Sequence, residues 1–309
     1  MSDHTSVRLE TAAGVLPDPG LPPQSSRAVG LLWRSLGHSG LVIGGVILIA
    51  IVALALAAPL IAPHDPYAQD LARRLRPPIW FAKGTWEHVL GTDKLGRDYL
   101  SRLIYGARIS LMIGSLTVVI SGTIGTLIGI CAGYFGGRVD AALSYVVTTR
   151  LALPVVLVAL ASAVVVGGSL QGVILVLGLL LWDRFAVVTR SATQQIVQAD
   201  YIAAAQAIGC STARILVSEI LPNILNALIV VATLEMAHAI LLEAALSFLG
   251  LGVQPPLPSW GLMISEAKPF LFFSPWLITI PGSLLLALVL SINLLGDGIR
   301  DLTAPEGRN

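Results

Sequence analysis

The chain has 309 residues and a formal net charge of +1, from 19 basic and 18 acidic side chains. Hydrophobic residues make up 55% of it and charged residues only 12%, and the mean hydropathy is +0.82. This composition excludes a soluble enzyme, which needs more surface charge, and predicts an all-α polytopic membrane protein. The nearly balanced charge also provides no basic stripe for nucleic acid.

Residues 1–40 differ in composition from the rest of the chain. They carry four prolines among serine, glycine and threonine, and they hold too few apolar side chains to form a core of their own. A cleaved signal peptide is the alternative, but its apolar part spans only about 7–15 residues and its polar leader is shorter. We therefore expect residues 1–40 to be a disordered cytoplasmic tail.

The first membrane-length segment follows this tail. Residues 41–61 form an uncharged run of 21 residues, close to the ~20 that cross a bilayer as a helix. Residues 62–108 are polar and carry eight basic side chains, partly offset by five acidic ones. The positive-inside rule alone would place this loop in the cytoplasm. An even number of spans with cytoplasmic termini places it outside instead, and we adopt that orientation.

Five further spans are expected. Residues 109–137 form a long uncharged run whose glycines and threonines suit close helix packing. The apolar stretch 141–181 is too long for one helix, and Gly167-Gly168-Ser169 is the expected break between two. Residues 224–249 and 276–295 supply the last two spans. The total is about six transmembrane helices.

A polar segment, residues 200–223, separates the fourth and fifth spans. Its alanines favour a short helix whose backbone a partner protein can approach closely. Gly209 is expected to reverse the chain with a positive φ, and Ser211 or Thr212 is expected to cap a second helix. That helix is expected to stop near Pro222, because proline removes a backbone donor. The pattern predicts a helix-turn-helix that docks on a cytoplasmic partner.

This segment resembles the coupling loop of ATP-binding-cassette (ABC) importer permeases. In those proteins Glu-Ala-Ala is followed, at fixed spacing, by a glycine and by an apolar-Leu-Pro ending. The chain departs from the pattern at Ala203, where the family has glutamate. The resemblance implies that coupling to an ATPase rests on Ala203, Ala204, Ala205, Gly209, Arg214, Leu221 and Pro222.

Three further segments resemble one branch of that family, the peptide/nickel permeases. Residues 90–111 are similar to its C-type subunit, which also begins with an extra helix like residues 41–61. Residues 243–261 and 293–301 resemble the same branch. The resemblance implies a type I ABC importer permease fold. Its parts would be a tail at 1–40, an extra helix at 41–61, an extracytoplasmic loop at 62–108, and a core at 109–302 with the coupling loop at 200–223.

The resemblance also implies a function and a set of partners. The chain would form half of a pathway for di- or oligopeptides in the bacterial plasma (inner) membrane, with both termini cytoplasmic. Nickel, opines and glutathione are alternative cargoes. The implied partners are a second permease subunit, two ABC ATPase subunits, an extracytoplasmic substrate-binding protein and membrane lipid. No lysine follows a glycine, so the chain has no phosphate-binding loop; ATP-Mg would be used by the partner subunits, and no cofactor is expected here.

Charged side chains inside the spans are candidates for the pathway, because an ion in hydrocarbon costs at least ~2.5–3.5 kcal/mol. Arg150 is expected either to face the bundle interior or to pair with a carboxylate on another helix. Glu235 and His238 lie three residues apart and share a helical face. We expect them either to line the pathway or to form a satisfied pair between packed helices. Glu243 is expected to hold the outer loop that follows it.

Two other polar groups have simpler interpretations. Asp183 and Arg184 are adjacent, so they point about 100° apart on a helix, and they are expected to mark the cytoplasmic mouth of the fourth span. Asp93, Arg97 and Asp98 are expected to form a local charge cluster. A metal site is the alternative, but no histidine or cysteine joins these residues at ligand spacing and His88 is the one histidine nearby, so we expect no metal ligand there.

A self-contained secondary transporter and an intramembrane enzyme are the alternatives from other classes. A secondary transporter needs no coupling segment and often carries internal repeats, which the two halves of this sequence do not show. An enzyme would have to use Glu235, His238 and Glu243 without a metal-ligand or nucleophile pattern. The coupling segment therefore favours the importer subunit.

Overall fold

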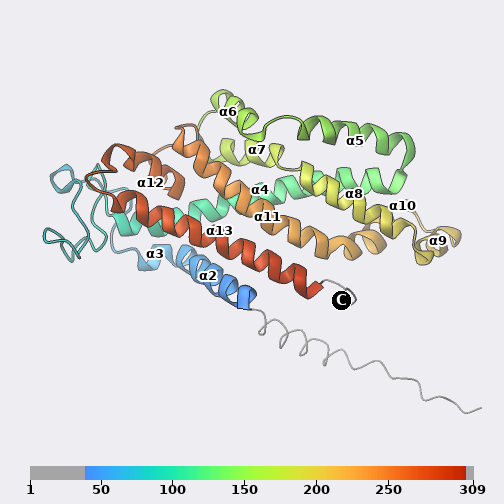
Figure 1. Cartoon of the computed structure of the whole chain (residues 1–309), viewed down its shortest axis with the longest axis horizontal. Helices are drawn as coiled ribbons and strands as arrows, with labels where there is room; N and C mark the ends of the chain where they lie inside the picture. The colour runs from blue at the N-terminus through green and yellow to red at the C-terminus, as the bar shows by residue number, and fades with distance from the viewer. Residues whose placement is uncertain (1–38, 304–309) are drawn as a thin grey trace, which may run out of the picture.

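The computed structural model describes residues 39–303, so the tail expected at residues 1–40 lies almost wholly outside it. The described part is a bundle of long helices without a β-strand (Figure 1). Five segments are long and apolar enough to cross a membrane, and a bent helix pair is a sixth candidate, as expected. The helices are α2 (Ser39–Leu56), α3 (Ala58–Ile61), α4 (Tyr99–Phe135), α5 (Gly137–Leu151), α6 (Val155–Val166), α7 (Leu170–Leu180), α8 (Asp183–Val197), α9 (Asp200–Ala207), α10 (Thr212–Arg214), α11 (Leu221–Phe248), α12 (Trp260–Ala267) and α13 (Trp276–Thr303).

Different segments of the chain lie at the two ends of the bundle (Figure 1). Helices α9 and α10 and the last turns of α13 lie at one end, and α12 and the loop 62–98 lie at the other. The start of α2 packs against the end of α13, since a Cβ added at Gly298 would lie 2.6 Å from the Cβ of Leu41. The start of the first described helix therefore contacts the end of the last one, toward the end of the bundle where α9 and α10 lie.

Helix α4 begins well before the span expected at 109–137. Asp98 caps it, accepting a hydrogen bond from the Ser101 backbone N–H at 2.8 Å. Arg102 lies inside this first turn and is fully buried, with Glu266 of α12 at 2.9 Å. The expected boundary was wrong because it assumed that charged residues stay outside the helix. Here the charge is paired with a carboxylate that is distant in the sequence.

The apolar stretch 141–181 contains more breaks than expected. The predicted break is present: Gly167 has φ +81°, and the Ser169 side chain caps α7. A second break separates α5 from α6, whose axes differ by 83°. Pro154 occupies the position before α6, where proline disfavours helical geometry in the preceding residue. The third expected span is therefore a bent pair rather than a straight helix.

The helix that follows the coupling turn does not stop at Pro222, contrary to expectation. Residues 212–248 form one membrane-length segment. A π-helical turn, Ile215–Ile220, immediately precedes α11. Proline offers no N–H to the carbonyl four residues earlier, and its ring crowds that carbonyl. The wider π-helical turn accommodates the ring, so the helix continues.

Helices α4 and α8 pack with their backbones close together. Gly125, Gly129 and Gly133 share one face of α4, at the four-residue spacing that lets two helices approach closely. A Cβ added at these positions would lie 2.2, 2.6 and 2.8 Å, respectively, from backbone carbonyl oxygens of the α8 segment. Those oxygens belong to Trp182, Ala186 and Arg190.

Candidate functional site

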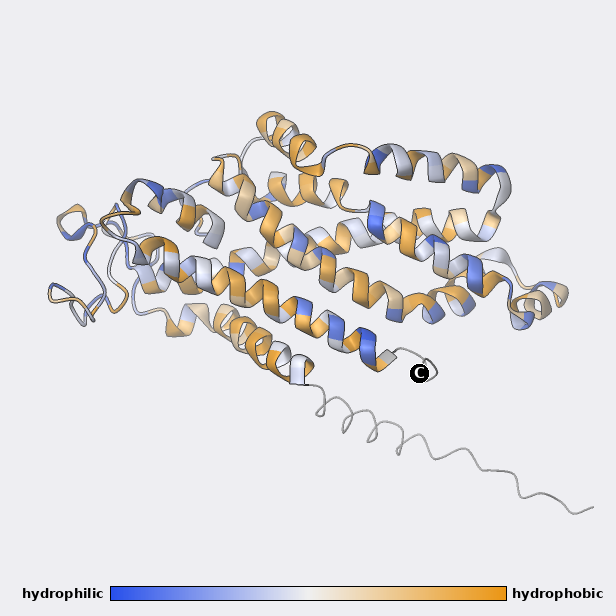
Figure 2. Cartoon of the chain, viewed as in Figure 1, coloured by the Kyte–Doolittle hydropathy of each residue, from blue (hydrophilic) through white to orange (hydrophobic). Residues whose placement is uncertain are grey.

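A cavity of about 230 Å³ lies where the α5–α6 break and the α7–α8 break meet α11. Hydrophilic turns interrupt the otherwise apolar helices in this region (Figure 2). All three residues expected to line the pathway reach the cavity, Arg150 from α5 and the other two, Glu235 and His238, from α11. Its polar lining consists of Arg150, Asp183, Arg184, Glu235 and His238.

Glu235 is the centre of this polar lining. Its side chain is 1% exposed, with Oε1 lying 3.1 Å from Nη1 of Arg184 and Oε2 lying 3.4 Å from Nδ1 of His238. The contact between Glu235 and His238 was expected from their spacing, whereas the contact with Arg184 was not. The Arg184 side chain remains 58% exposed. A buried carboxylate is thus paired with a guanidinium that stays open to the cavity.

Asp183 and Arg184 do not mark the mouth of a span, contrary to expectation. They lie at the break between α7 and α8, near the midpoint of the 28-residue candidate span 170–197. The apolar run ends at this break, but the membrane-length segment continues through a more polar helix. Asp183 Oδ1 accepts a hydrogen bond from the Arg184 backbone N–H at 2.9 Å. This bond satisfies one of the free donors at the start of α8.

Arg150 faces the bundle interior, the first of the two expected arrangements. Its guanidinium donates to the backbone carbonyl of Leu180 and, at 3.4 Å, to that of Leu153. The last carbonyl groups of a helix lack intrahelical partners, and Leu180 is the last residue of α7. Arg150 therefore ties the α5–α6 break to the α7–α8 break. It meets carbonyl groups rather than the carboxylate that the other alternative required.

The coupling segment is fixed to the bundle by isoleucines. Ile202 of α9 is fully buried in a cluster with Ile130 of α4 and with Ile215, Ile220 and Ile224. Gly209 has φ +83°, as the expected turn requires. Ser211 occupies the cap position of α10 but makes no side-chain capping bond. The apolar anchor residues leave the opposite face of α9 free to contact another protein.

The residues expected to couple this chain to an ATPase lie between α9 and the start of α11, and α9 and α10 lie at one end of the bundle (Figure 1). Five of them are exposed and two are partly buried. Leu221 is one of the partly buried pair and packs against the isoleucine cluster. Ile208 is 80% exposed next to them, which is unusual for so large an apolar side chain. The exposed residues are Ala203, Ala204, Gly209, Arg214 and Pro222, and the partly buried ones are Ala205 and Leu221.

Glu243 lies near the C-terminal end of α11. It is fully buried, and its Oε1 accepts hydrogen bonds from the Ser247 hydroxyl at 2.7 Å and from the Ser259 hydroxyl at 2.9 Å. Ser259 in turn caps α12, accepting from the Leu262 N–H at 3.1 Å. The carboxylate thus joins α11 to the loop that precedes α12.

The charge cluster at the opposite end differs from the expected one. Asp93 contacts Arg97 at 2.6 Å and also Arg102, and Glu266 of α12 lies 3.2 Å from Arg97. Asp98 takes no part and caps α4 instead. Burial raises the pKa of the Glu266 carboxyl, but the positive charges of Arg102 and Arg97 outweigh it and hold that pKa below its ordinary value. The cluster is therefore an ionised link between the loop and α12.

Family models match most of the chain. The model described as "Binding-protein-dependent transport system inner membrane component" matches residues 125–308. The model described as "N-terminal TM domain of oligopeptide transport permease C" matches residues 31–78. The first match includes the cavity-lining helices and the coupling segment, and the second includes α2 and α3.

Named relatives cover nearly the full length. The di/tripeptide transport system permease protein DppC of Pseudomonas aeruginosa is 41% identical over 90% of this chain and 92% of its own. The dipeptide transport system permease protein DppC of Escherichia coli strain K12 is 42% identical over 87% of this chain and 90% of its own. Among solved structures, an inward-facing MetNI methionine ABC transporter aligns with a TM-score of 0.54 and 19% identity over 66% of this chain and 97% of that one. At that identity the likeness concerns the fold alone.

Proposed function

The chain belongs to the family of binding-protein-dependent transport system inner membrane components, and we propose that it forms half of the pathway through which an ABC importer carries di- or oligopeptides. Relatives named for dipeptide or di/tripeptide transport support peptides over nickel, opines or glutathione. In this family ATP is used by separate subunits. The remaining parts of the complex would be a second permease, two ATPase subunits and an extracytoplasmic binding protein.

The observation that carries this proposal is a partly exposed guanidinium near the middle of a span. Arg184 is 58% exposed there, and an arginine facing lipid at such depth would cost at least ~2.5–3.5 kcal/mol. This face of the bundle therefore fits a polar pathway better than lipid. The cavity, at about 230 Å³, is smaller than the ~300–1,000 Å³ of complete ligand sites. That size fits a half-pathway that a second permease completes.

The charges in the cavity match the chemistry of a peptide. A peptide carries an ammonium group at one end and a carboxylate at the other. Arg150 and Arg184 would attract the carboxylate, and Asp183 and Glu235 would attract the ammonium group. These groups belong to three separate helical segments, so movement of the segments changes their spacing. Closure of the ATPase subunits would push on α9 and transmit that movement along the segment 212–248.

Uptake by the purified complex tests the proposed cargo. With its partner subunits and binding protein in proteoliposomes, the complex is expected to accumulate a labelled dipeptide only when ATP is supplied. Nickel should not accumulate under the same conditions. Omission of the binding protein is the control, because this family depends on delivery by such a protein. Uptake of nickel without uptake of peptide would overturn the assignment.

The proposed orientation places the coupling segment in the cytoplasm and the loop 62–98 outside. We expect a membrane-impermeant thiol reagent to label Lys83→Cys in cells whose outer membrane is permeable. Ala204→Cys should be labelled only after the cells are opened. Both positions are exposed, and the native Cys131 and Cys210 must first be replaced. The reverse pattern of labelling would mean that the chain has the opposite orientation in the membrane.

The turn at Gly209 gives a sharp test of coupling. Gly209→Val is expected to reduce ATP-driven uptake by roughly tenfold or more, because a β-branched residue resists positive φ by about 1–3 kcal/mol. Apart from its chain neighbours, no atom of the described residues lies within 4 Å of the added Cβ, so the effect would come from the backbone. Gly209→Asn is the matched control, since asparagine tolerates this conformation. Equal uptake by the valine and asparagine variants would refute the role of the turn.

A further inference from the structure

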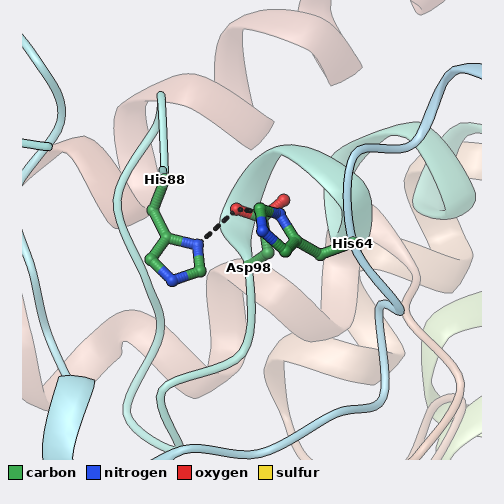
Figure 3. Close-up of side chains that lie close together, drawn as sticks. All are labelled: His64, His88 and Asp98. Atoms are coloured by element: carbon green, nitrogen blue, oxygen red, sulfur yellow. Dashed lines mark hydrogen bonds and ion pairs between the residues drawn. The ribbon is translucent and has the colours of Figure 1, made fainter. Parts of the chain in front are cut away.

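Two histidines and an aspartate from separate segments meet beside the start of α4 (Figure 3). His64 follows α3, His88 lies in the loop 62–98, and Asp98 caps α4. Nδ1 of His88 lies 2.9 Å from Oδ1 of Asp98, and Nδ1 of His64 lies 3.6 Å from the same oxygen. All three residues offer a ligand atom within 4.8 Å of the others. The three ligand atoms therefore lie close enough together to share one metal ion.

Asp98 is held in place by its second oxygen. Oδ2 accepts hydrogen bonds from the Ser101 N–H at 2.8 Å and from the Ser101 hydroxyl at 2.7 Å. The backbone N–H of His64 donates to the same hydroxyl at 3.1 Å. Oδ1 is left facing the two imidazoles. Outer hydrogen bonds of this kind orient metal ligands in known sites.

One imidazole nitrogen in this cluster has no hydrogen-bond partner among the described residues. Nδ1 of His64 is buried and makes no hydrogen bond, because 3.6 Å to Asp98 is too long. Asp98 Oδ1 already bonds to His88. The two rings lie with their centroids 4.9 Å apart, so both nitrogens approach the carboxylate from neighbouring directions. A bound ion would give the His64 nitrogen a partner that residues 39–303 do not supply.

We propose that His64, His88 and Asp98 bind a divalent transition-metal ion, with Zn²⁺ as the best match. Imidazole and carboxylate are ligands that zinc takes, and two ligands about 2 Å from a tetrahedral ion stand roughly 3.3 Å apart. The separations of 2.9 and 3.6 Å bracket that value. The His64 side chain is 36% exposed, which leaves access for water as a fourth ligand. The ion would join the segment after α3, the loop and α4.

This site is independent of the proposed transport function, since it lies in the loop region and not at the cavity. Metal binding can be measured on the full chain, purified in detergent with an affinity tag that contains no histidine. We expect the wild-type chain to bind Zn²⁺, and Co²⁺ in its place to give the visible absorption of a tetrahedral site. Zn²⁺ should also raise the melting temperature of the wild-type chain, because a ligand that binds only the folded state stabilises it.

Two variants keep the local structure while removing a ligand. His88→Asn retains an N–H that can reach Asp98, but an amide nitrogen is a poor metal ligand. Asp98→Asn keeps the helix cap, because asparagine caps as well as aspartate, and removes the anionic oxygen. Each is expected to lose at least about tenfold in Zn²⁺ affinity and to lose the stabilisation by Zn²⁺. His238→Gln removes a histidine elsewhere and should bind Zn²⁺ as the wild type does.

Two outcomes would overturn the site. One is a wild-type chain that binds no Zn²⁺ at a free Zn²⁺ concentration of about 10 μM, which means that its Kd is well above about 10 μM. The other is Zn²⁺ binding that is unchanged in both His88→Asn and Asp98→Asn. In either case the three residues would form only a hydrogen-bonded contact that shapes the loop.

Discussion

Gly125→Ala is expected to lower the free energy of unfolding by about 3 kcal/mol or more and to reduce the yield of folded complex severely. The added Cβ would lie 2.2 Å from the Trp182 carbonyl oxygen and 2.5 Å from the Phe185 Cβ. A backbone oxygen cannot turn aside as the end of a flexible side chain can. Helices α4 and α8 would therefore have to separate, and their contact along Gly129 and Gly133 would open with them.

Denaturation of the purified chain in mild detergent, followed by helical circular dichroism, measures this loss. Gly45→Ala in α2 is the matched control, because among residues 39–303 its added Cβ would meet only Leu295 Cδ1, at 4.0 Å. Alanine also forms helix better than glycine by up to ~1 kcal/mol, so this variant should be as stable as the wild type or slightly more stable. Similar stability of the Gly125→Ala and Gly45→Ala variants would show that α4 and α8 do not depend on close contact.

Features that depend on local sequence were predictable. The break at Gly167–Ser169 and the turn at Gly209 follow from the positive φ that glycine readily adopts, and both are present. The number of candidate spans follows from the length of each apolar run. The contact between Glu235 and His238 follows from their three-residue spacing on one helix. Each of these predictions needed only neighbouring residues.

Features that depend on partners distant in the sequence were not predictable. Arg102 lies within α4 because Glu266 of α12 neutralises it, so the charge did not mark the end of a loop. Arg184 lies near the middle of a candidate span, where it faces the cavity and pairs with Glu235 of α11. A hydropathy pattern treats each charge as if it were alone in lipid, and therefore places it at a helix end. Pairing with carboxylates lowers that cost for the buried Arg102, and the polar cavity lowers it for Arg184, so both charges lie within membrane-length segments.

The pair formed by Arg184 and Glu235 should respond asymmetrically to the loss of either member. Arg184→Gln leaves the Glu235 carboxylate buried at 1% exposure without its guanidinium, and breaking a buried pair in this way costs about 3–5 kcal/mol. The nearby His238 would offset part of that cost. Glu235→Gln leaves Arg184 58% exposed and hydrated, so its cost should stay near or below about 1 kcal/mol.

A double-mutant cycle on the same denaturation assay separates this pair from the surrounding packing. The double variant Arg184→Gln and Glu235→Gln is expected to be more stable than Arg184→Gln alone, because no buried charge remains unpaired. Arg138→Gln, which removes an exposed arginine at the start of α5, controls for the loss of one cation. In uptake assays Glu235→Gln should weaken the preference for peptides with a free amino terminus over acetylated ones, because the carboxylate that attracts the ammonium group is gone. Equal destabilisation by both single variants, with unchanged preference, would mean that the pair only holds α8 to α11 and that the cargo passes elsewhere.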